Sequence, residues 1–185
     1  MKKATILFLI IIAGSLFAQT EEQIQAYNDY MTPGPEHKLL SRMEGEWNYK
    51  MYLYMAPGQD PLEATGTATG KVILDGRYLK LLHEGVSFGM PYQAEQVIGY
   101  DRVKAGYITN YIDNMGTGFL IATGPAGQDG KSIEMKGTFA EPMTKSDTGF
   151  RCVQKFMDDG SFLMELYVTF EGKESKTWET RYTRK

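Results

Sequence analysis

The sequence has few of the residues from which disulfides and metal centres are built. One cysteine and two histidines occur among its 185 residues. A single cysteine excludes a disulfide within the chain and a cysteine-rich zinc site. Two histidines are too few for a multi-histidine metal centre. We therefore expect no bound metal ion.

Excess positive charge is also missing. The chain has 20 Lys and Arg against 23 Asp and Glu, which gives a net charge of −3. Nucleic-acid binders carry a basic patch or stripe, so we expect no nucleic-acid partner. The abundant residues instead favour β structure, since the chain has 20 glycines, 12 tyrosines and 9 phenylalanines.

One long apolar run occurs, between Thr5 and Ala13, and it follows Lys2 and Lys3. A basic start, a short apolar run and a small residue at Ala18 are typical of a secretory signal. We predict that residues 1–18 are removed and that the protein is exported to the bacterial periplasm or beyond. The run is shorter than the roughly 20 residues that span a bilayer, and no transmembrane segment is expected after its removal.

A short helical segment, residues 19–34, precedes the main domain. Thr20-Glu21-Glu22-Gln23 matches a capping box and predicts a helix that reaches about Tyr30. Pro33-Gly34-Pro35 ends this helix, and Pro35 suits the first position of a second helix over residues 36–43. We expect His37 to be exposed on that helix. Residues 35–185 are interpreted as one domain.

After Gly45 the hydrophobic period changes from 3.6 to 2. Tight-turn pairs such as Asp75-Gly76 separate alternating segments at intervals of roughly 8–12 residues, which predicts an antiparallel all-β meander. A sandwich and a closed barrel both fit this pattern, and an up-and-down barrel is favoured because closure removes exposed strand edges. The predicted strands are residues 47–55, 65–74, 77–84, 92–100, 107–113, 117–123, 132–139, 150–156, 162–170 and 175–184.

Gly45-Glu46-Trp47 opens the first predicted strand directly after a helix. This resembles the G-x-W signature of lipocalins and the wider calycin group. The resemblance implies that Trp47 closes one end of the barrel and that an arginine of the last strand packs on its face. Arg184 is favoured because it shares a strand face with Tyr182, with Arg181 as the alternative. A guanidinium over an indole is a favourable cation–π pair.

Four further motifs occur in the order and spacing of the bacterial DUF1579 family. The resemblance covers residues 35–185 and implies a calycin-like barrel without an assigned activity. That family usually has an aromatic residue where this chain has Ile112, so the pattern leaves open which aromatic residue of this strand faces the interior. The motifs are Gly76-Arg77-Tyr78, Gly99-Tyr100-Asp101, Tyr111-x-Asp113-x-x-Gly116-Thr117 and Tyr182-x-Arg184.

The function we expect is non-catalytic binding of a small apolar or amphipathic molecule inside the barrel. A barrel of about eight strands can already hold one small ligand, and tyrosines offer an apolar body with a polar tip. Core packing of these tyrosines, in a filled and purely structural barrel, is the alternative. The candidate ligand-binding residues are Tyr49, Arg77, His83, Tyr100, Tyr107, Tyr111 and Asp113.

An enzyme is a second alternative, with a site inside the barrel made by Arg77, His83, Tyr111 and Asp113. Arg77 is expected to face inward and to pair with a carboxylate or an anionic ligand. Asp113, like Asp101, also fits a turn-capping role. The segment from Gly85 to Gly89 matches G-x-S-x-G, but a nucleophile elbow needs a helix after the serine, and a hairpin loop fits better.

His83 shares a face with Leu79 and Leu81 in the third predicted strand and is expected to point inward. An inward histidine could ligate a haem iron. A hydrogen-bonded lining residue is the preferred interpretation, and haem is kept only as an alternative cofactor.

Overall fold

The computed structural model describes residues 20–56, 58–125, 127 and 130–185. The predicted signal segment lies outside the described residues. The chain divides between Thr32 and Pro33 into two compact units. Within the described part of the chain, no helix has the length and apolar character needed to cross a bilayer.

The first unit contains helix α2 (Glu21–Met31). Its N-terminus is held by the predicted capping box. The Thr20 hydroxyl accepts a hydrogen bond from the Gln23 amide at 3.2 Å, and the Gln23 side chain accepts one from the Thr20 amide at 3.0 Å. Two of the free N–H groups at the start of the helix are satisfied in this way.

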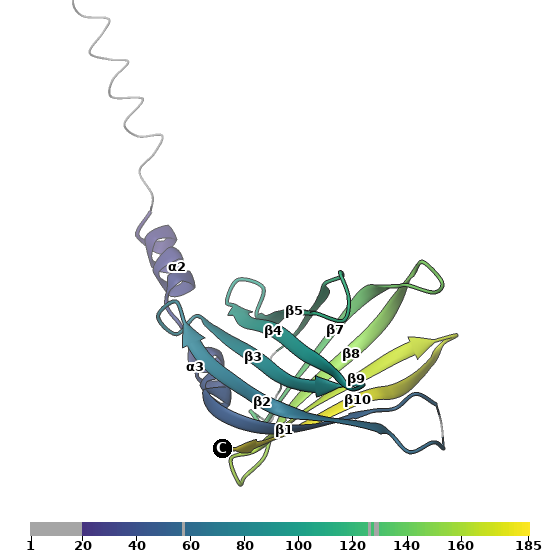
Figure 1. The fold of residues 1–185 in the computed structure, drawn as a ribbon. Coiled ribbons are helices and arrows are strands. Elements are labelled where there is room, and N and C mark those ends of the chain that lie inside the picture. The colour runs from purple at the N-terminus through teal and green to yellow at the C-terminus, as the bar shows by residue number, and fades with distance from the viewer. Residues whose placement is uncertain (1–19, 57, 126, 128–129) are drawn as a thin grey trace, which may run out of the picture. The chain divides into compact units, whose positions relative to one another are not determined.

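The second unit is a closed barrel of ten antiparallel strands, each paired with its neighbour in sequence, and β1 pairs with β10 (Figure 1). This confirms the predicted all-β up-and-down barrel and excludes a sandwich. Helix α3 (Pro35–Leu40) and the 3₁₀ turn η1 (Ser41–Met43) precede it. The strands are β1 (Gly45–Leu53), β2 (Leu62–Ile73), β3 (Tyr78–Ser87), β4 (Met90–Asp101), β5 (Gly106–Asp113), β6 (Leu120–Pro125), β7 (Ser132–Glu141), β8 (Ser146–Phe156), β9 (Phe162–Phe170) and β10 (Lys173–Arg184).

One end of the barrel is closed by Trp47, which is fully buried. Its indole N–H donates to the Met43 carbonyl at 2.9 Å, so η1 is tied to the first strand. Trp47 and Arg184 are partners in the β1–β10 register. Arg184, not Arg181, packs on the indole.

An aromatic column runs from this plug through the barrel interior. Trp47 meets Phe162 edge to face at 4.7 Å between ring centroids, and Phe162 stacks on Tyr182 at 4.1 Å. Tyr182 in turn contacts His83, whose ring centroid is 5.8 Å away. Aromatic pairs at these separations add to the free energy of burial. The column therefore links the closed end to the middle of the barrel.

Tyr49 lies across a pair of glycines that face each other in the β2–β3 register, Gly66 and Gly85. A Cβ atom on Gly66 would lie 2.6 Å from the Tyr49 hydroxyl, closer than real Cβ contacts allow. The ring thus occupies the space that side chains at these two positions would need. Glycine is needed at both positions because the Tyr49 side chain lies so close to the backbone there.

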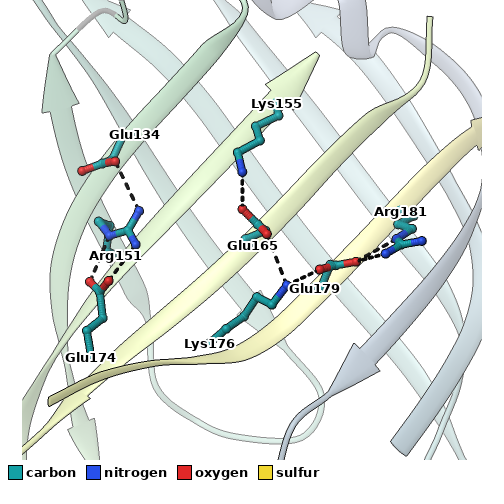
Figure 2. Close-up of polar contacts among 8 residues, drawn as sticks. All are labelled: Glu134, Arg151, Lys155, Glu165, Glu174, Lys176, Glu179 and Arg181. Carbon is teal, nitrogen blue, oxygen red and sulfur yellow. Dashed lines mark hydrogen bonds and ion pairs between the residues drawn. The ribbon is translucent and has the colours of Figure 1, made fainter. Parts of the chain in front are cut away.

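The outer face of β8, β9 and β10 carries a chain of ion pairs (Figure 2). Glu165 and Glu179 are direct partners in the β9–β10 register, and both are nearly buried, at 7% and 3% exposed. Like charges in such positions repel. Lys176 lies between them and bonds to both, at 3.4 Å to Glu165 and closer to Glu179.

Further cations complete this chain of ion pairs. Lys155 bonds to Glu165 at 2.7 Å, and Arg181 bonds to Glu179 at 2.7 Å. Burial alone would raise the pKa of each carboxyl, but the hydrogen bonds from the cations outweigh it and lower both pKa values. The two carboxylates are therefore charged at neutral pH. Their negative charges are balanced by the lysine and arginine side chains that bond to them on this outer face.

The exposed position predicted for His37 is wrong. The side chain is only 8% exposed, its Nδ1 atom accepts a hydrogen bond from the Gly34 amide at 2.9 Å, and its ring meets Tyr100 edge to face. A helix of six residues leaves its first N–H groups free, and the imidazole serves as a cap for one of them.

Candidate functional site

A cavity of about 50 Å³ lies inside the barrel, on the far side of the aromatic column from Trp47. Such a volume accommodates a few water molecules, whereas drug-sized ligands need roughly 300 Å³ or more. Most of the interior is filled by side chains. The residues that line the cavity are His83, Gln96, Thr109, Tyr111, Leu120, Cys152, Met164, Glu165, Leu166, Trp178, Thr180 and Tyr182.

The residues that line this cavity differ in burial. Along β10, Tyr182 and Thr180 are buried, whereas Trp178 is partly exposed. Leu120 and Leu166 are also partly exposed apolar residues. The cavity surface is mostly apolar, and buried polar side chains such as Gln96 and Thr109 border it. The rim of the cavity is apolar.

His83 forms the deepest polar contact of the cavity. Its Nε2 atom is 2.9 Å from the Tyr182 hydroxyl, and both side chains are buried. Burial lowers the pKa of His83 to about 4, with the backbone of Ala94 acting weakly in the opposite direction. Burial raises the pKa of Tyr182 well above its ordinary value. Both groups are therefore neutral at pH 7.

Tyr92 and Tyr111 share a hydrogen bond between their hydroxyls, on the side of the cavity formed by β4 and β5. Burial raises the pKa of both phenols. Tyr111 also meets Trp178 edge to face at 5.7 Å. Tyr111 is therefore the inward aromatic residue of its strand, whereas Ile112 is 39% exposed on the outer face.

Gln96 and Thr109 form a third polar pair, with fixed roles. The Thr109 hydroxyl donates to the Val97 carbonyl at 3.1 Å, so its oxygen is left as an acceptor. The Gln96 side-chain N–H donates to that oxygen at 3.0 Å. The Gln96 amide thus presents its nitrogen to Thr109, and its Oε1 atom has no donor among the described residues.

Several interior polar atoms have no hydrogen-bond partner among the described residues. Buried polar atoms in native proteins almost always have a partner, from the protein, from water or from a ligand. Of the five such atoms in this interior, those of His83 and Gln96 belong to residues that line the cavity. The atoms are Tyr49 Oη, His83 Nδ1, Gln96 Oε1 and both side-chain polar atoms of Gln154.

Comparison with known families agrees with this architecture. The family described as "Protein of unknown function (DUF1579)" matches residues 32–184. The chain belongs to the DUF1579 family. No curated protein matches the sequence. Among solved structures, the crystal structure of Rv2717c from M. tuberculosis is similar with a TM-score of 0.60 and 14% identity. The match covers 83% of this chain and 99% of that one. At this identity the likeness supports the fold alone.

The DUF1579 motifs mainly form turns and close backbone contacts in this chain. Asp101 accepts hydrogen bonds from the amides of Val103 and Lys104, and Asp113 accepts them from Met115 and Gly116. The predicted turn-capping roles of both aspartates are confirmed. In the register, Tyr78 is the partner of Gly99, where a Cβ atom would lie 2.6 Å from the tyrosine ring.

The inward position predicted for Arg77 is wrong. Arg77 precedes β3 in a turn, its side chain is 40% exposed, and it donates to the Leu74 carbonyl at 3.2 Å. The strand begins one residue later than predicted, so the alternation that would turn Arg77 inward does not apply. Arg77 also lies six residues before His83, about 20 Å along a strand.

Tyr100 and Tyr107 lie at the closed end, outside the cavity. The Tyr107 hydroxyl donates to the Glu36 carbonyl at 3.0 Å, and the two tyrosine rings pack with centroids 5.0 Å apart. They anchor α3 to the barrel. Of the predicted candidates, the structure brings His83 and Tyr111 to the cavity. Tyr49 lies beside His83, with ring centroids 5.8 Å apart.

Of the residues of the enzyme alternative, Arg77 lies away from the others, in the turn before β3. His83 and Asp113 are both register partners of Ala94, but the Asp113 carboxylate accepts hydrogen bonds from the Met115 and Gly116 amides of its turn. Ser87 ends β3, and the next two residues have φ angles of 52° and 76°, so the G-x-S-x-G segment is a tight hairpin. No helix follows the serine, in keeping with the hairpin interpretation.

Haem does not fit this interior. The only cavity-lining histidine in the described part of the chain, His83, uses Nε2 to bond Tyr182. A porphyrin is drug-sized or larger and cannot enter about 50 Å³ without wide repacking of the barrel. Among the described residues, no group of three His, Cys, Asp or Glu side chains is placed to hold a metal ion.

Sequence reasoning missed Gln96, Thr109 and Thr180 as site residues. Each is a buried polar residue on an inward face of its strand. Gln96 lies between Ala94 and Ile98 on that face, and a polar residue within an apolar alternation is a signal of an interior site. That signal was available in the sequence.

Proposed function

We propose that this DUF1579 protein binds a small amphipathic molecule, without catalysis, and that the polar end of the molecule enters the barrel cavity. The proposal rests mainly on one observation. Buried polar atoms without partners, including Gln96 Oε1, occur in a barrel whose cavity has an apolar rim. The interior therefore has hydrogen-bonding capacity that the chain itself does not use.

The lining favours an amphipathic over a purely apolar molecule. A hydrocarbon in the cavity would leave the buried acceptors unpaired, which costs binding free energy. A polar group would satisfy them. The remainder of the molecule would lie along Leu120, Leu166 and Trp178, because about 50 Å³ has room for the polar end only.

Catalysis is not part of the proposal because the lining has no suitable acid–base group. His83 and Tyr182 would be the natural pair. Efficient general acids and bases have pKa values near the working pH. Burial moves the pKa of His83 to about 4 and that of Tyr182 upward, so both are far from neutrality. We assign both to binding.

Export is the second part of the proposal. It is supported by the sequence pattern of residues 1–18, with two lysines before an apolar run and Ala18 at the end. N-terminal sequencing of protein expressed in its own host tests it. We expect Gln19 as the first residue in a periplasmic or secreted fraction, and an intact N-terminus in the cytoplasmic fraction would contradict it.

Native mass spectrometry tests ligand binding. Protein purified from its own host should retain a small molecule. Cys152→Met should abolish that mass, because the longer side chain fills the cavity that Cys152 lines. Thr169→Met, at an exposed position of β9, is the matched control and should retain it. A wild-type protein without any bound molecule, or an added mass that survives Cys152→Met, would contradict the proposal.

A further inference from the structure

We infer that the cavity selects an uncharged polar group that donates a hydrogen bond, such as an alcohol or a primary amide, over a carboxylate or an ammonium. This inference rests on the proposed function and names the chemical class of its ligand. It follows from the fixed hydrogen-bonding roles of Gln96 and Thr109 and from where the charged side chains of the barrel lie.

Gln96 sets the requirement for a donor. The Thr109 hydroxyl donates to a backbone carbonyl, that of Val97 at 3.1 Å or that of Asn110 at 3.4 Å, and one Gln96 N–H donates to the Thr109 oxygen. The buried Gln96 Oε1 atom is left without a donor. A carboxylate cannot supply one, because both of its oxygens only accept. A hydroxyl or an amide N–H can.

A counter-charge for an anion is missing from the wall. No Lys or Arg of the described chain lines the cavity. The basic residues of β8 and β10 nearest in sequence to this wall are on the outer face and already paired. Arg151 bonds to Glu134 and Glu174, and Lys155, Lys176 and Arg181 bond to Glu165 or Glu179 (Figure 2). An anion in the cavity would lose its hydration without gaining an ion pair.

For a cation, the carboxylates near the cavity are already engaged. Burial raises the pKa of the Tyr111 phenol, and the nearby Asp113 carboxylate raises it further, but this carboxylate accepts hydrogen bonds from the Met115 and Gly116 amides. Glu165 borders the cavity, but its neighbours Met164 and Leu166 face inward and its own carboxylate bonds to Lys155 and Lys176 outside.

The remaining polar groups of the lining residues are hydroxyls, the Gln96 amide, the neutral His83 ring, the Cys152 thiol and the Trp178 indole N–H, which donates to Thr180. These groups can donate hydrogen bonds to an uncharged ligand or accept them from it. Such a ligand carries no charge whose hydration would be lost on entering the cavity.

Three probes with the same eight-carbon chain test the inference: 1-octanol, octanoate and octylammonium. Binding is measured by isothermal titration calorimetry and by the fluorescence of Trp178, which contacts Tyr111 at the cavity. Trp178→Phe is the optical control, since Trp47 at the closed end should not respond. We expect 1-octanol to bind roughly tenfold or more tightly than either charged probe at pH 7.

Gln96→Leu tests the donor requirement in the same assay. It removes the free acceptor at similar side-chain volume, and we expect it to weaken 1-octanol binding roughly fivefold or more. Gln96→Met replaces it if the leucine variant does not fold. Equal binding of all three probes, tighter binding of a charged probe, or no effect of either Gln96 variant would overturn the inference and leave the proposed function in place. No binding of any probe, together with no retained mass from the host, would overturn both.

Discussion

The guanidinium of Arg184 lies 3.9 Å from the centroid of the Trp47 ring, so the last residue of the final strand covers the third residue of the first. The same guanidinium donates to the Glu44 carbonyl at 2.6 Å and to the Arg42 carbonyl at 3.3 Å. Gly45 makes room for it, since a Cβ atom there would collide with the Arg184 Nη1 atom. One side chain thus joins the last strand to the first strand and to the chain that precedes it.

Trp47→Ala should lower the free energy of unfolding by roughly 3–5 kcal/mol, because it removes a large, fully buried aromatic side chain and its contacts with Phe162. Chemical denaturation measures the loss. Near-neutral stability would contradict the role of Trp47 as the plug.

Arg184→Ala should cost about 1–3 kcal/mol, since it removes two charge-assisted hydrogen bonds and the cation–π contact. Arg181→Ala is the matched control on the same strand. Arg181 faces outward and is 64% exposed, so we expect a loss of about 1 kcal/mol or less. Equal losses in the two variants would argue against a special role for Arg184.

The buried His83 should make the free energy of unfolding depend on pH. Burial lowers its pKa from 6.5 to about 4, so between these values the unfolded chain binds a proton that the folded chain does not. The free energy of unfolding therefore falls as the pH falls through this window. From pH 7 to pH 5 the His83 contribution should fall by about 2 kcal/mol.

The non-titrating variant His83→Gln should lose that part of the pH dependence. The buried carboxylates Glu165 and Glu179 are common to both proteins and cancel in the comparison. Denaturation at the two pH values measures the difference. Identical pH dependence in both proteins, or an imidazole pKa above 6 by NMR, would be incompatible with a buried neutral His83.

Much of the barrel was readable from the sequence, because an alternating pattern such as Trp47, Tyr49 and Met51 in β1 shows which face of the strand is buried. The pairing of Trp47 with an arginine of the last strand was implied by the resemblance to the calycin group, and the shared strand face with Tyr182 favoured Arg184. The interior site was harder. The helix-capping role of His37 and the turn position of Arg77 depend on where α3 and β3 begin, and one residue of difference reverses a side chain's direction.

Gln96 and Glu165 show that hydrophobic periodicity does not predict the partners of a buried polar residue. Both are nearly buried polar residues in strands. Gln96 lines the interior and hydrogen-bonds to Thr109, whereas Glu165 is covered on the outside by Lys155 and Lys176. Only the register between strands brings these partners together, and register is set by pairing over the whole sheet.

Lys176→Met should destabilise the barrel by about 1–3 kcal/mol, because it leaves Glu165 and Glu179 opposed without the cation between them. The loss stays below that of a fully buried pair since Lys155 and Arg181 remain. Added salt should reduce it, as screening weakens the repulsion. Lys136→Met, at a side chain that is 72% exposed, is the control and should be nearly neutral. A Lys176 variant as stable as this control would show that the outer ion pairs contribute little.

Gly85→Ala should be strongly destabilising, by roughly 2 kcal/mol or more, because a Cβ atom there would collide with the Tyr49 hydroxyl and lie 2.5 Å from the Thr65 carbonyl. Gly149→Ala is the matched control, since β8 offers open space at that position. It should be neutral or slightly stabilising. Thermal unfolding of both variants compares them, and similar melting temperatures would mean that Tyr49 can move away from the glycine pair.

A crystal structure of the protein purified from its own host tests most directly whether the barrel interior receives the polar end of a small molecule. We predict non-protein density that passes Trp178 and ends within hydrogen-bond distance of Gln96 Oε1. Water molecules alone in the cavity, with the rim residues Leu120, Leu166 and Trp178 packed against one another, would contradict the account.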